Sequence, residues 1–259
     1  MSADRVPLRF GSPVHTLRLR GLRGEDEEAI VDADAGTAAA LALIDALILS
    51  GVDERPPRGA ELTTADRDRV LAAIYIRAFG ARISSSVRCV QCEARFDVDF
   101  SLRDLMRDAD EAIERGTDAV VRLSDGRRYR LPTGADERAA LASDDPAVAL
   151  LNACALDGVK QEDGATVPAL MQKVAPLLDV DLDATCPECS TKQSLRFDVQ
   201  SYLLAALRAE EAQLLREVHR LAVTYGWSRA EILALPRERR RSHAALIEAA
   251  TRLSRRARA

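Results

Sequence analysis

Two Cys-x-x-Cys pairs, Cys89 with Cys92 and Cys186 with Cys189, constrain the fold of this 259-residue chain more than any other feature. Each pair can present two thiolates to one metal ion, and two such pairs complete a tetrahedral all-cysteine shell. This is the usual ligand set of a closed structural zinc site, with one zinc ion. A closed shell leaves no position for water or substrate, so the pattern predicts a scaffold and not a zinc enzyme.

Other interpretations of these cysteines remain open. Two disulfides would suit a secreted protein, but residues 1–5 (MSADR) contain no apolar signal core. A redox Cys-x-x-Cys normally opens a helix, whereas each pair here precedes a strand-like run. The gap between Cys92 and Cys186 is 93 residues (186 − 92 − 1), against about 15–20 in a compact zinc ribbon. A metal site requires only that its ligands be close in space, so structural zinc stays the main prediction beside disulfide, redox and chance.

The segments that follow the two pairs resemble each other. Residues 87–101 read VRCVQCEARFDVDFS, and ATCPEC at 184–189 is followed by QSLRFDVQS at 193–201. Both predict a cysteine knuckle, an alternating strand with Phe-Asp-Val, and then Ser101 or Ser201 as a helix N-cap. We therefore expect two half-ribbons that face each other across a metal ion. Coincidence over a short stretch is the alternative.

The composition is that of a globular protein, with 47% apolar and 30% charged residues. Aromatic residues make up only 4%, so the core is expected to be aliphatic. The longest apolar run, residues 38–49, is too short to span a membrane and carries Asp45. Because no export or lipidation signal is visible, we expect a cytoplasmic protein, in which thiols stay reduced and bind zinc.

The expected fold class is α+β: a zinc-ribbon-like four-cysteine core with an inserted α/β segment and a helical C-terminal region. We divide the chain into an N-terminal region of strand and helices (1–85), a split zinc ribbon (86–200) that contains the insertion (101–183), and a helical region with a basic tail (201–259). Apolar periodicity and capping residues predict further elements. These are helices over 25–31, 37–49, 64–79, 101–115 and 201–225, a strand over 14–20 and a hairpin turn over 124–127.

Several side chains have a structural interpretation. The charged stretch 66–69 (DRDR) is expected to be a solvated helix face. Cys154, in an apolar helix, is expected to be a buried small hydrophobe rather than a metal ligand or nucleophile. Pro146 and Pro168 are expected in the first turns of helices. The only tryptophan, Trp227, is expected to anchor packing rather than to bind a ligand.

The charge of the chain is uneven. The net charge is −4, but residues 236–259 contain eight arginines and two glutamates, which leaves −10 on the rest. Such a tail could bind nucleic acid, dock on an acidic neighbour, or dock on the body itself. No aromatic residue interleaves with the arginines, as a single-strand-binding platform would require. Nucleic acid is therefore not the expected partner.

No catalytic constellation is visible. None of the three histidines, His15, His219 and His243, neighbours a nucleophile in a known motif. A Gly-rich phosphate loop and a His-Glu-x-x-His motif are both absent from the sequence. We expect a protein that is not an enzyme and that has no small-molecule substrate.

Four segments carry a resemblance to a known family. They are 215–236 (LREVHRLAVTYGWSRAEILALP), 18–27 (RLRGLRGEDE), 62–67 (LTTADR) followed by a helix and the first cysteine pair, and 129–137 (YRLPTGADE). Together they resemble small baseplate proteins of contractile-tail phages, relatives of which occur in phage-tail-like contractile injection systems. The resemblance spans most of the chain and includes no catalytic signature.

The resemblance implies a non-enzymatic structural or assembly subunit of a baseplate that engages hub or wedge proteins in a tail-like particle. The arginine-rich end beyond Pro236 lies outside the matching segments. The alternative function is that of a zinc-ribbon nucleic-acid-binding protein, which would use this arginine-rich tail.

Overall fold

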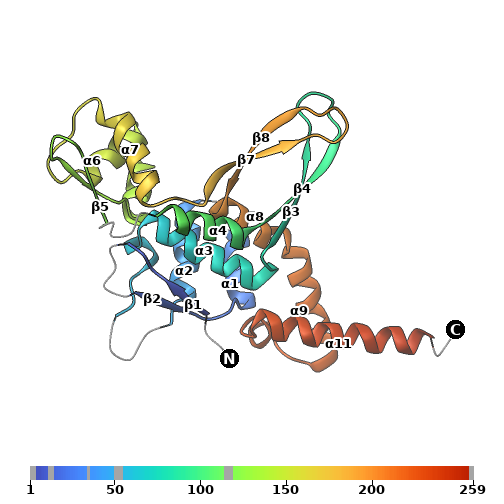
Figure 1. Ribbon diagram of the computed structural model, residues 1–259. Helices are drawn as coiled ribbons and strands as arrows, with labels where there is room; N and C mark the ends of the chain where they lie inside the picture. Colours follow the sequence, from blue (N-terminus) through green and yellow to red (C-terminus); the bar gives the residue numbers. More distant parts are fainter. Residues whose placement is uncertain (1–3, 11–14, 34–35, 50–54, 114–118, 257–259) are drawn as a thin grey trace.

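The computed structural model describes residues 4–10, 15–33, 36–49, 55–113 and 119–256. The fold is α+β, as expected: within these ranges, helices form the body, and the strands form four separate two-stranded antiparallel sheets. Two long hairpins project from one side of the body, and the C-terminal helix extends away from another (Figure 1). Val14, expected to begin a strand, and Arg258 of the basic tail lie outside the described residues.

The elements follow one another along the chain as helices interspersed with hairpins. The strands are β1 Asp4–Pro7, β2 Thr16–Leu19, β3 Arg82–Arg88, β4 Arg95–Ser101, β5 Val120–Arg122, β6 Arg128–Arg130, β7 Asp179–Thr185 and β8 Lys192–Asp198. The helices are α1 Gly24–Asp32, α2 Thr37–Leu47, the 3-10 turn η1 Gly59–Glu61, α3 Thr64–Phe79, α4 Leu102–Ala112, α5 Gly134–Ala140, α6 Pro146–Cys154, α7 Asp163–Val174, α8 Val199–Ala209, α9 Glu211–Tyr225, α10 Arg229–Leu233 and α11 Arg237–Arg256.

The main core lies between α2, α3, α8 and the β1–β2 sheet, and its residues are mostly aliphatic, as the composition predicts. Helix α3 begins where expected, because the Thr63 side chain accepts a hydrogen bond from the backbone N–H of Asp66. It ends at Gly80, whose φ of +91° is open to glycine at little cost. The buried stripe between these ends, including Val70 and Leu71, packs into the core.

The stretch 66–69 on α3 is not a solvated face; all four of its side chains are buried. The Asp66 carboxylate accepts hydrogen bonds from the backbone N–H groups of Arg9 (2.8 Å) and Phe10 (2.9 Å). Asp68 accepts one from the N–H of Leu178 (3.1 Å), just before β7. The two carboxylates therefore satisfy backbone donors from distant segments, which explains why they are buried.

The two arginines of the same stretch extend this network into the insertion. Arg67 pairs with Asp68 (3.1 Å) and with Glu137 of α5, and Arg69 pairs with Asp110 of α4 (2.6 Å). Burial raises the pKa of Asp68 to about 6, although the neighbouring guanidinium of Arg67 opposes the shift. Helix α3 thus joins the N-terminal segment to both ends of the insertion through charged groups.

The region after β8 differs from the expectation in two respects. Asp198, not Ser201, is the N-cap of α8, since its carboxylate accepts hydrogen bonds from the backbone N–H groups of Gln200 (3.2 Å) and Ser201 (3.0 Å). The single helix expected to reach Tyr225 is broken at Glu210 into α8 and α9.

The prediction for Pro168 is also wrong, because this proline lies inside α7. The helix starts earlier, where the buried Asp163 carboxylate accepts hydrogen bonds from Tyr129 Oη (2.6 Å) and from the backbone N–H of Lys160 (2.7 Å). Pro146 does occupy the first turn of α6, as expected.

Candidate metal centre

The two cysteine pairs meet at the tips of the two long hairpins, β3–β4 and β7–β8, which together we call the arm (Figure 1). The Sγ atoms of Cys89, Cys92, Cys186 and Cys189 all lie within 4.8 Å of one another. Two distances join the hairpins directly: 3.6 Å from Cys89 to Cys189 and 3.7 Å from Cys92 to Cys186. Each hairpin therefore supplies half of a four-sulfur cluster that can hold a metal ion.

The two turns that carry the cysteines have the same backbone structure. In each, the first cysteine, Cys89 or Cys186, donates its backbone N–H to the carbonyl of the residue five positions later (2.9 Å in both). The carbonyl of the same cysteine accepts from the residue four positions later, at 3.1 and 2.9 Å. That residue, Glu93 or Ser190, has a left-handed φ of 59° or 60°. This shared geometry directs both sulfurs of each pair to one point.

The hairpins form an internal repeat with an offset of 97 residues, from Cys89 to Cys186 (186 − 89). Strands β3 and β7 start 97 residues apart, and so do β4 and β8. The expected repeat is therefore present, but its alignment differs from the one expected. Alignment of the two Phe-Asp-Val runs pairs Phe96 with Phe197, an offset of 101, which is four more than the offset of the hairpins. The correct offset pairs Ser101 with Asp198, and both are N-caps of the helix that follows.

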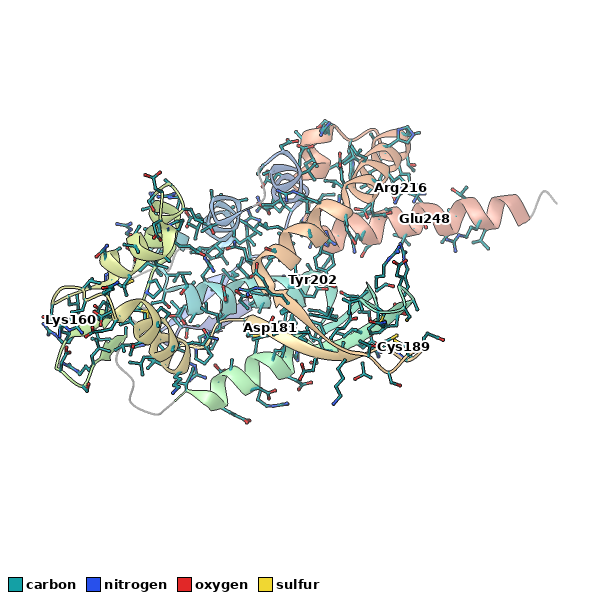
Figure 2. All side chains as sticks on the ribbon, turned by 90° about the horizontal axis from the view of Figure 1, so that it is seen from above. Lys160, Asp181, Cys189, Tyr202, Arg216 and Glu248 are labelled. Atoms are coloured by element: carbon teal, nitrogen blue, oxygen red, sulfur yellow. The ribbon has the colours of Figure 1, made fainter. Side chains whose placement is uncertain are left out.

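The same offset pairs Phe100 with Phe197, and these two rings touch edge to face with centroids 5.0 Å apart. Phe197 also contacts Tyr202 of α8 (5.4 Å), and Tyr202 contacts Tyr75 of α3 (5.5 Å). Tyr202 lies near the base of the arm and Cys189 at its far end (Figure 2). An aromatic cluster thus anchors the arm at the body, and the cysteines join it at the tip.

A side-chain amide also connects the tips. Gln193 of β8 accepts a hydrogen bond from the backbone N–H of Val90 (3.0 Å) and donates one to the carbonyl of Arg88 (3.2 Å). Both bonds cross from the second hairpin to the first. The cysteines are therefore held close by protein contacts as well.

The electrostatics of the cluster favour a cation. Thr191, through its hydroxyl and its backbone N–H, lowers the pKa of the Cys189 thiol to about 6. The N–H of Ala94 lowers the pKa of Cys92, but hydrogen bonds to the neighbouring cysteines outweigh it and raise the value to about 12. Four adjacent sulfurs cannot all lose their protons without a positive charge among them, and a bound metal ion supplies that charge.

Cys154 lies apart from this cluster. It is buried at the end of α6 beside Tyr129 and Val167, as a small hydrophobe would be. Burial raises the pKa of its thiol to about 11, which keeps it protonated and unreactive. Its side chain lines an apolar cavity of about 330 Å³ between α6, α7 and the start of α3.

The histidines contribute no ligand to a metal cluster. Within the described parts of the chain, the four cysteines form the one group of three or more His, Cys, Asp or Glu side chains arranged to hold an ion. His15 and His219 are exposed. His243 packs edge to face on Trp227 (5.3 Å) and Tyr225 (5.8 Å). Trp227 is half-buried in this corner, in agreement with a packing role.

The first turn of the basic tail docks on the body, a contact that reasoning from the sequence left undecided. Arg240 is buried and pairs with Glu217 of α9 (2.7 Å) and with Glu27 of α1 (2.5 Å). Arg237 pairs with the same Glu27 and with Glu210 (2.7 Å). The signal that could have revealed this is the spacing of arginines 237, 240 and 241, which places them on one helix face. Arg241 also lies near Glu210 and Glu217.

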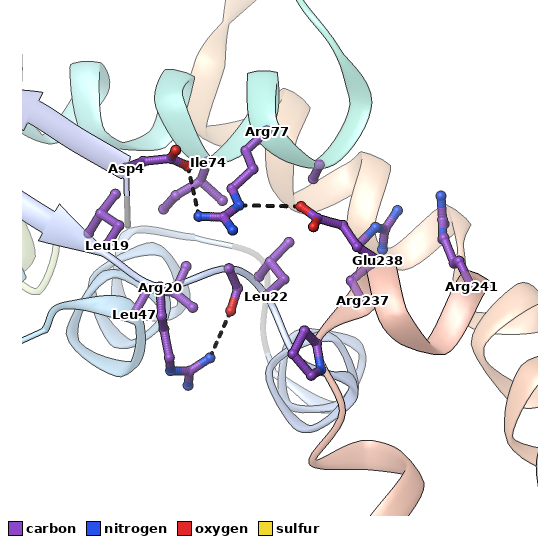
Figure 3. Close-up of a pocket in the computed structure, with 13 residues that line it drawn as sticks. Asp4, Leu19, Arg20, Leu22, Leu47, Ile74, Arg77, Arg237, Glu238 and Arg241 are labelled. Carbon is purple, nitrogen blue, oxygen red and sulfur yellow. Dashed lines mark hydrogen bonds and ion pairs between the residues drawn. The ribbon is translucent and has the colours of Figure 1, made fainter. Parts of the chain in front are cut away.

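A cavity of about 240 Å³ lies where this turn meets β2 and α3 (Figure 3). Four arginines line it, which suggests an anion site. However, Arg77 is paired with Asp4 (2.9 Å) and Arg20 with Asp26 (2.6 Å), and Arg237 and Arg241 hold the pairs described above. Because their charges are compensated by carboxylates, the cavity offers little attraction to an anion.

Comparison of the chain with protein-family models, with curated proteins and with solved structures finds no match. Among the described residues, no helix combines the length and the apolar character needed to cross a membrane.

Proposed function

We propose that the four cysteines hold one structural zinc ion at the tip of the arm. Tetrahedral zinc with thiolate bonds of about 2.3 Å places its sulfurs about 3.8 Å apart, and the two cross-hairpin distances are 3.6 and 3.7 Å. The same shell suits iron, which mass spectrometry of the metal distinguishes from zinc. Four protein ligands complete the coordination, so the ion would join the hairpins and would not activate water.

Metal analysis of the purified protein tests this proposal. We expect one zinc per chain, and its loss in Cys186→Ser, because three ligands hold the ion far more weakly than four. Cys154→Ala is the matched control, and it should retain the metal since Cys154 is remote from the cluster. A stoichiometry near zero in the wild type, or an unchanged value in Cys186→Ser, would remove the basis of the proposal.

We further propose that the chain acts by binding other proteins, as a non-enzymatic subunit of the baseplate of a contractile phage-tail-like particle. The observation that supports this is the clustering of four cysteine sulfurs, because a metal ion with four protein ligands serves as a structural link between the hairpins and not as a catalyst. The resemblance of residues 215–236 to baseplate proteins is the reason for proposing a contractile phage-tail-like particle as the assembly. In the fold this segment is α9, a turn at Gly226 (φ 71°) and α10, a rigid corner closed by the Trp227 ring.

The alternative, nucleic-acid binding by the arginine-rich tail, is less well supported. Arg237, Arg240 and Arg241 are engaged with carboxylates of the body, which removes three cations from contact with phosphates. Binding through the remaining arginines would weaken steeply with salt. Such salt-dependent binding of DNA by the purified protein would favour the alternative.

Particles from a producing strain provide the test. Mass spectrometry should find the chain in purified particles or, if it acts only in assembly, a strain that lacks it should make no complete particles. Deleting residues 201–259 would be uninformative, because this also removes core residues such as Leu203 and Leu204 of α8. A strain that lacks the whole chain and still makes complete, contractile particles would contradict the proposal.

A further inference from the structure

We infer that the four-cysteine cluster is a redox-sensitive link between the two hairpins of the arm. When no metal ion holds the sulfurs, a peroxide converts the cluster into two disulfides that cross from one hairpin to the other, Cys89–Cys189 and Cys92–Cys186. This second state rests on the proposed zinc site only in that the ion must leave before the disulfides form. The tips of the arm then stay joined in reducing and in oxidising surroundings.

The pairing follows from two short distances across the arm. Four cysteines can pair in three ways. The Sγ atom of Cys89 lies 3.6 Å from that of Cys189, and Sγ of Cys92 lies 3.7 Å from that of Cys186. A disulfide bond is about 2.0 Å long, so the sulfurs of each pair must approach by about 1.6 Å. Rotation about the Cα–Cβ bonds moves a sulfur this far while the hairpins stay in place.

Hydrogen bonds within the turns oppose the alternative, a disulfide inside one Cys-x-x-Cys pair. The backbone N–H of Gln91 donates to Cys89 Sγ (3.4 Å), and Cys189 Sγ lies 3.2 Å from the Thr191 hydroxyl. These contacts add to the backbone bonds that fix each turn. A disulfide inside a pair would have to form within a fixed turn of four residues, whereas the cross-hairpin disulfides leave both turns intact.

Contacts that do not involve the cysteine side chains hold the hairpins together without a metal. The amide of Gln193 makes both of its hydrogen bonds to the first hairpin, at Val90 and Arg88. Behind the cysteines, Phe96 of β4 and Ala184 of β7 are buried in one apolar cluster that both hairpins share. The thiols of the two tips therefore stay at high effective concentration, which favours a bond between them over a bond to a second chain.

The exposure of the sulfurs decides where the oxidation starts. Cys92 and Cys189 are exposed, whereas Cys89 and Cys186 are buried, so each cross-hairpin pair joins an exposed sulfur to a buried one (Cys189 is labelled in Figure 2). Hydrogen peroxide oxidises the exposed thiol to a sulfenic acid and releases one water. The buried thiol then attacks that sulfur: the S–S bond forms, the S–O bond breaks, and the hydroxyl leaves as a second water with the proton of the thiol.

Mass spectrometry of the full-length protein tests the pairing. The protein is stripped of metal with a chelator, treated with hydrogen peroxide, and digested with trypsin, which releases fragments 89–95 and 174–192, each with one cysteine pair. We expect the intact mass to fall by four hydrogen atoms and the two fragments to be joined, with fragment-ion sequencing assigning Cys89 to Cys189. Treatment of the metal-loaded protein should give the same products and release the ion. Dithiothreitol followed by zinc should restore the starting state.

Two double variants supply the matched control. Cys92→Ser/Cys186→Ser retains Cys89 and Cys189, which should join the two fragments readily. Cys92→Ser/Cys189→Ser also retains one cysteine in each hairpin, but both are buried. Its fragments should be joined about tenfold more slowly or less, because peroxide has poor access to a buried thiol. Both variants lack two of the four sulfurs, and circular dichroism before oxidation should be the same for both.

Four results would overturn the inference: disulfides within the pairs, links between two chains, sulfinic acids that dithiothreitol does not reduce, or equal rates for the two double variants. The proposed zinc ion fails separately, because metal analysis of the untreated protein measures it. Protein that contains no zinc but forms both cross-hairpin disulfides contradicts the zinc proposal and supports the inference. Protein that contains one zinc per chain, and whose stripped form oxidises within the pairs, does the reverse.

Discussion

Replacement of Arg240 by methionine should destabilise the protein strongly. The side chain of Arg240 is 1% exposed and lies between those of Glu217 (1% exposed) and Glu27 (5%). Methionine fills much of the same volume but leaves two buried carboxylates short of a cation. Removing one partner from a buried ion pair typically costs about 3–5 kcal/mol.

The remaining contacts place the expected cost at the lower end of this range. Without Arg240, Glu27 still pairs with Arg237, and Glu217 keeps a hydrogen bond from Gln213 (2.9 Å) and a longer contact with Arg241 (3.7 Å). We therefore expect a loss of about 3 kcal/mol in the free energy of unfolding. For a chain of this length, that corresponds to about 6–12 °C in the melting temperature.

Urea denaturation of a double-mutant cycle tests the reasoning. Arg240→Met combined with Glu217→Leu should be more stable than Arg240→Met alone, by roughly 1 kcal/mol or more, because the second change removes the unpaired carboxylate. The control is Arg252→Met in the same helix. Arg252 is 79% exposed and pairs with Glu248 (3.5 Å), which is itself 36% exposed, so its loss should cost less than about 0.5 kcal/mol. Two results would refute the idea that these buried ion pairs hold the first turn of α11 on the body: additive effects of Arg240→Met and Glu217→Leu, or a loss below about 1 kcal/mol for Arg240→Met alone.

Three further predictions follow from other parts of the fold. A strong chelator should lower the melting temperature of the wild type, because the proposed metal ion would close a loop of about a hundred residues and contribute several kcal/mol to stability; an unchanged transition would mean that no metal stabilises the fold. The pKa of Asp68 is about 6 in the folded protein and near 4 in the unfolded chain. Protonation of Asp68 therefore stabilises the fold as the pH falls from about 6 to about 4, and this stabilisation is lost as the pH rises through 6. Asp68→Asn has no titrating group at this position. The free energy of unfolding of the wild type minus that of the variant, measured by urea titration, should therefore increase as the pH is lowered from 7 to 5. A difference that does not change with pH would contradict the raised pKa of Asp68. Gly134→Ala should destabilise by about 1–3 kcal/mol, because its Cβ would lie 2.7 Å from Leu41 Cδ2 and 3.1 Å from the Gly59 carbonyl. Gly164→Ala in α7, where nothing lies within 4 Å, should instead stabilise by up to about 1 kcal/mol.

Local signals in the sequence predicted the clustering of the four cysteines and many helix ends. The cysteine spacing identified all four clustered sulfurs, because two residues between cysteines suffice to form a turn that presents both. The helix expected over 64–79 begins at Thr64 and ends at Phe79, and Ser101 caps α4 as expected. These features depend on interactions within a few residues, which a sequence displays directly.

Features that depend on distant partners were not predictable in this way. The burial of residues 66–69 requires groups that lie 41 to 110 positions away, such as Asp110 and Leu178. The break at Glu210 involves no glycine or proline. It places the Glu210 carboxylate beside Arg237 and Arg241, which come later in the chain. Neither apolar periodicity nor composition indicates which charged residues far apart in the sequence form ion pairs.

The 97-residue separation of the two half-sites has a consequence for biosynthesis. A ribosome that adds about 5–20 residues per second makes Cys186 roughly 5–20 s after Cys89. During this interval the nascent chain displays only Cys89 and Cys92, half of a ligand set, while the intervening segment 102–178 is translated. An ion bound at that stage has two open positions and can exchange. For the proposed metal site, stable capture of the ion is therefore a late event, because it requires that the second hairpin has been completed.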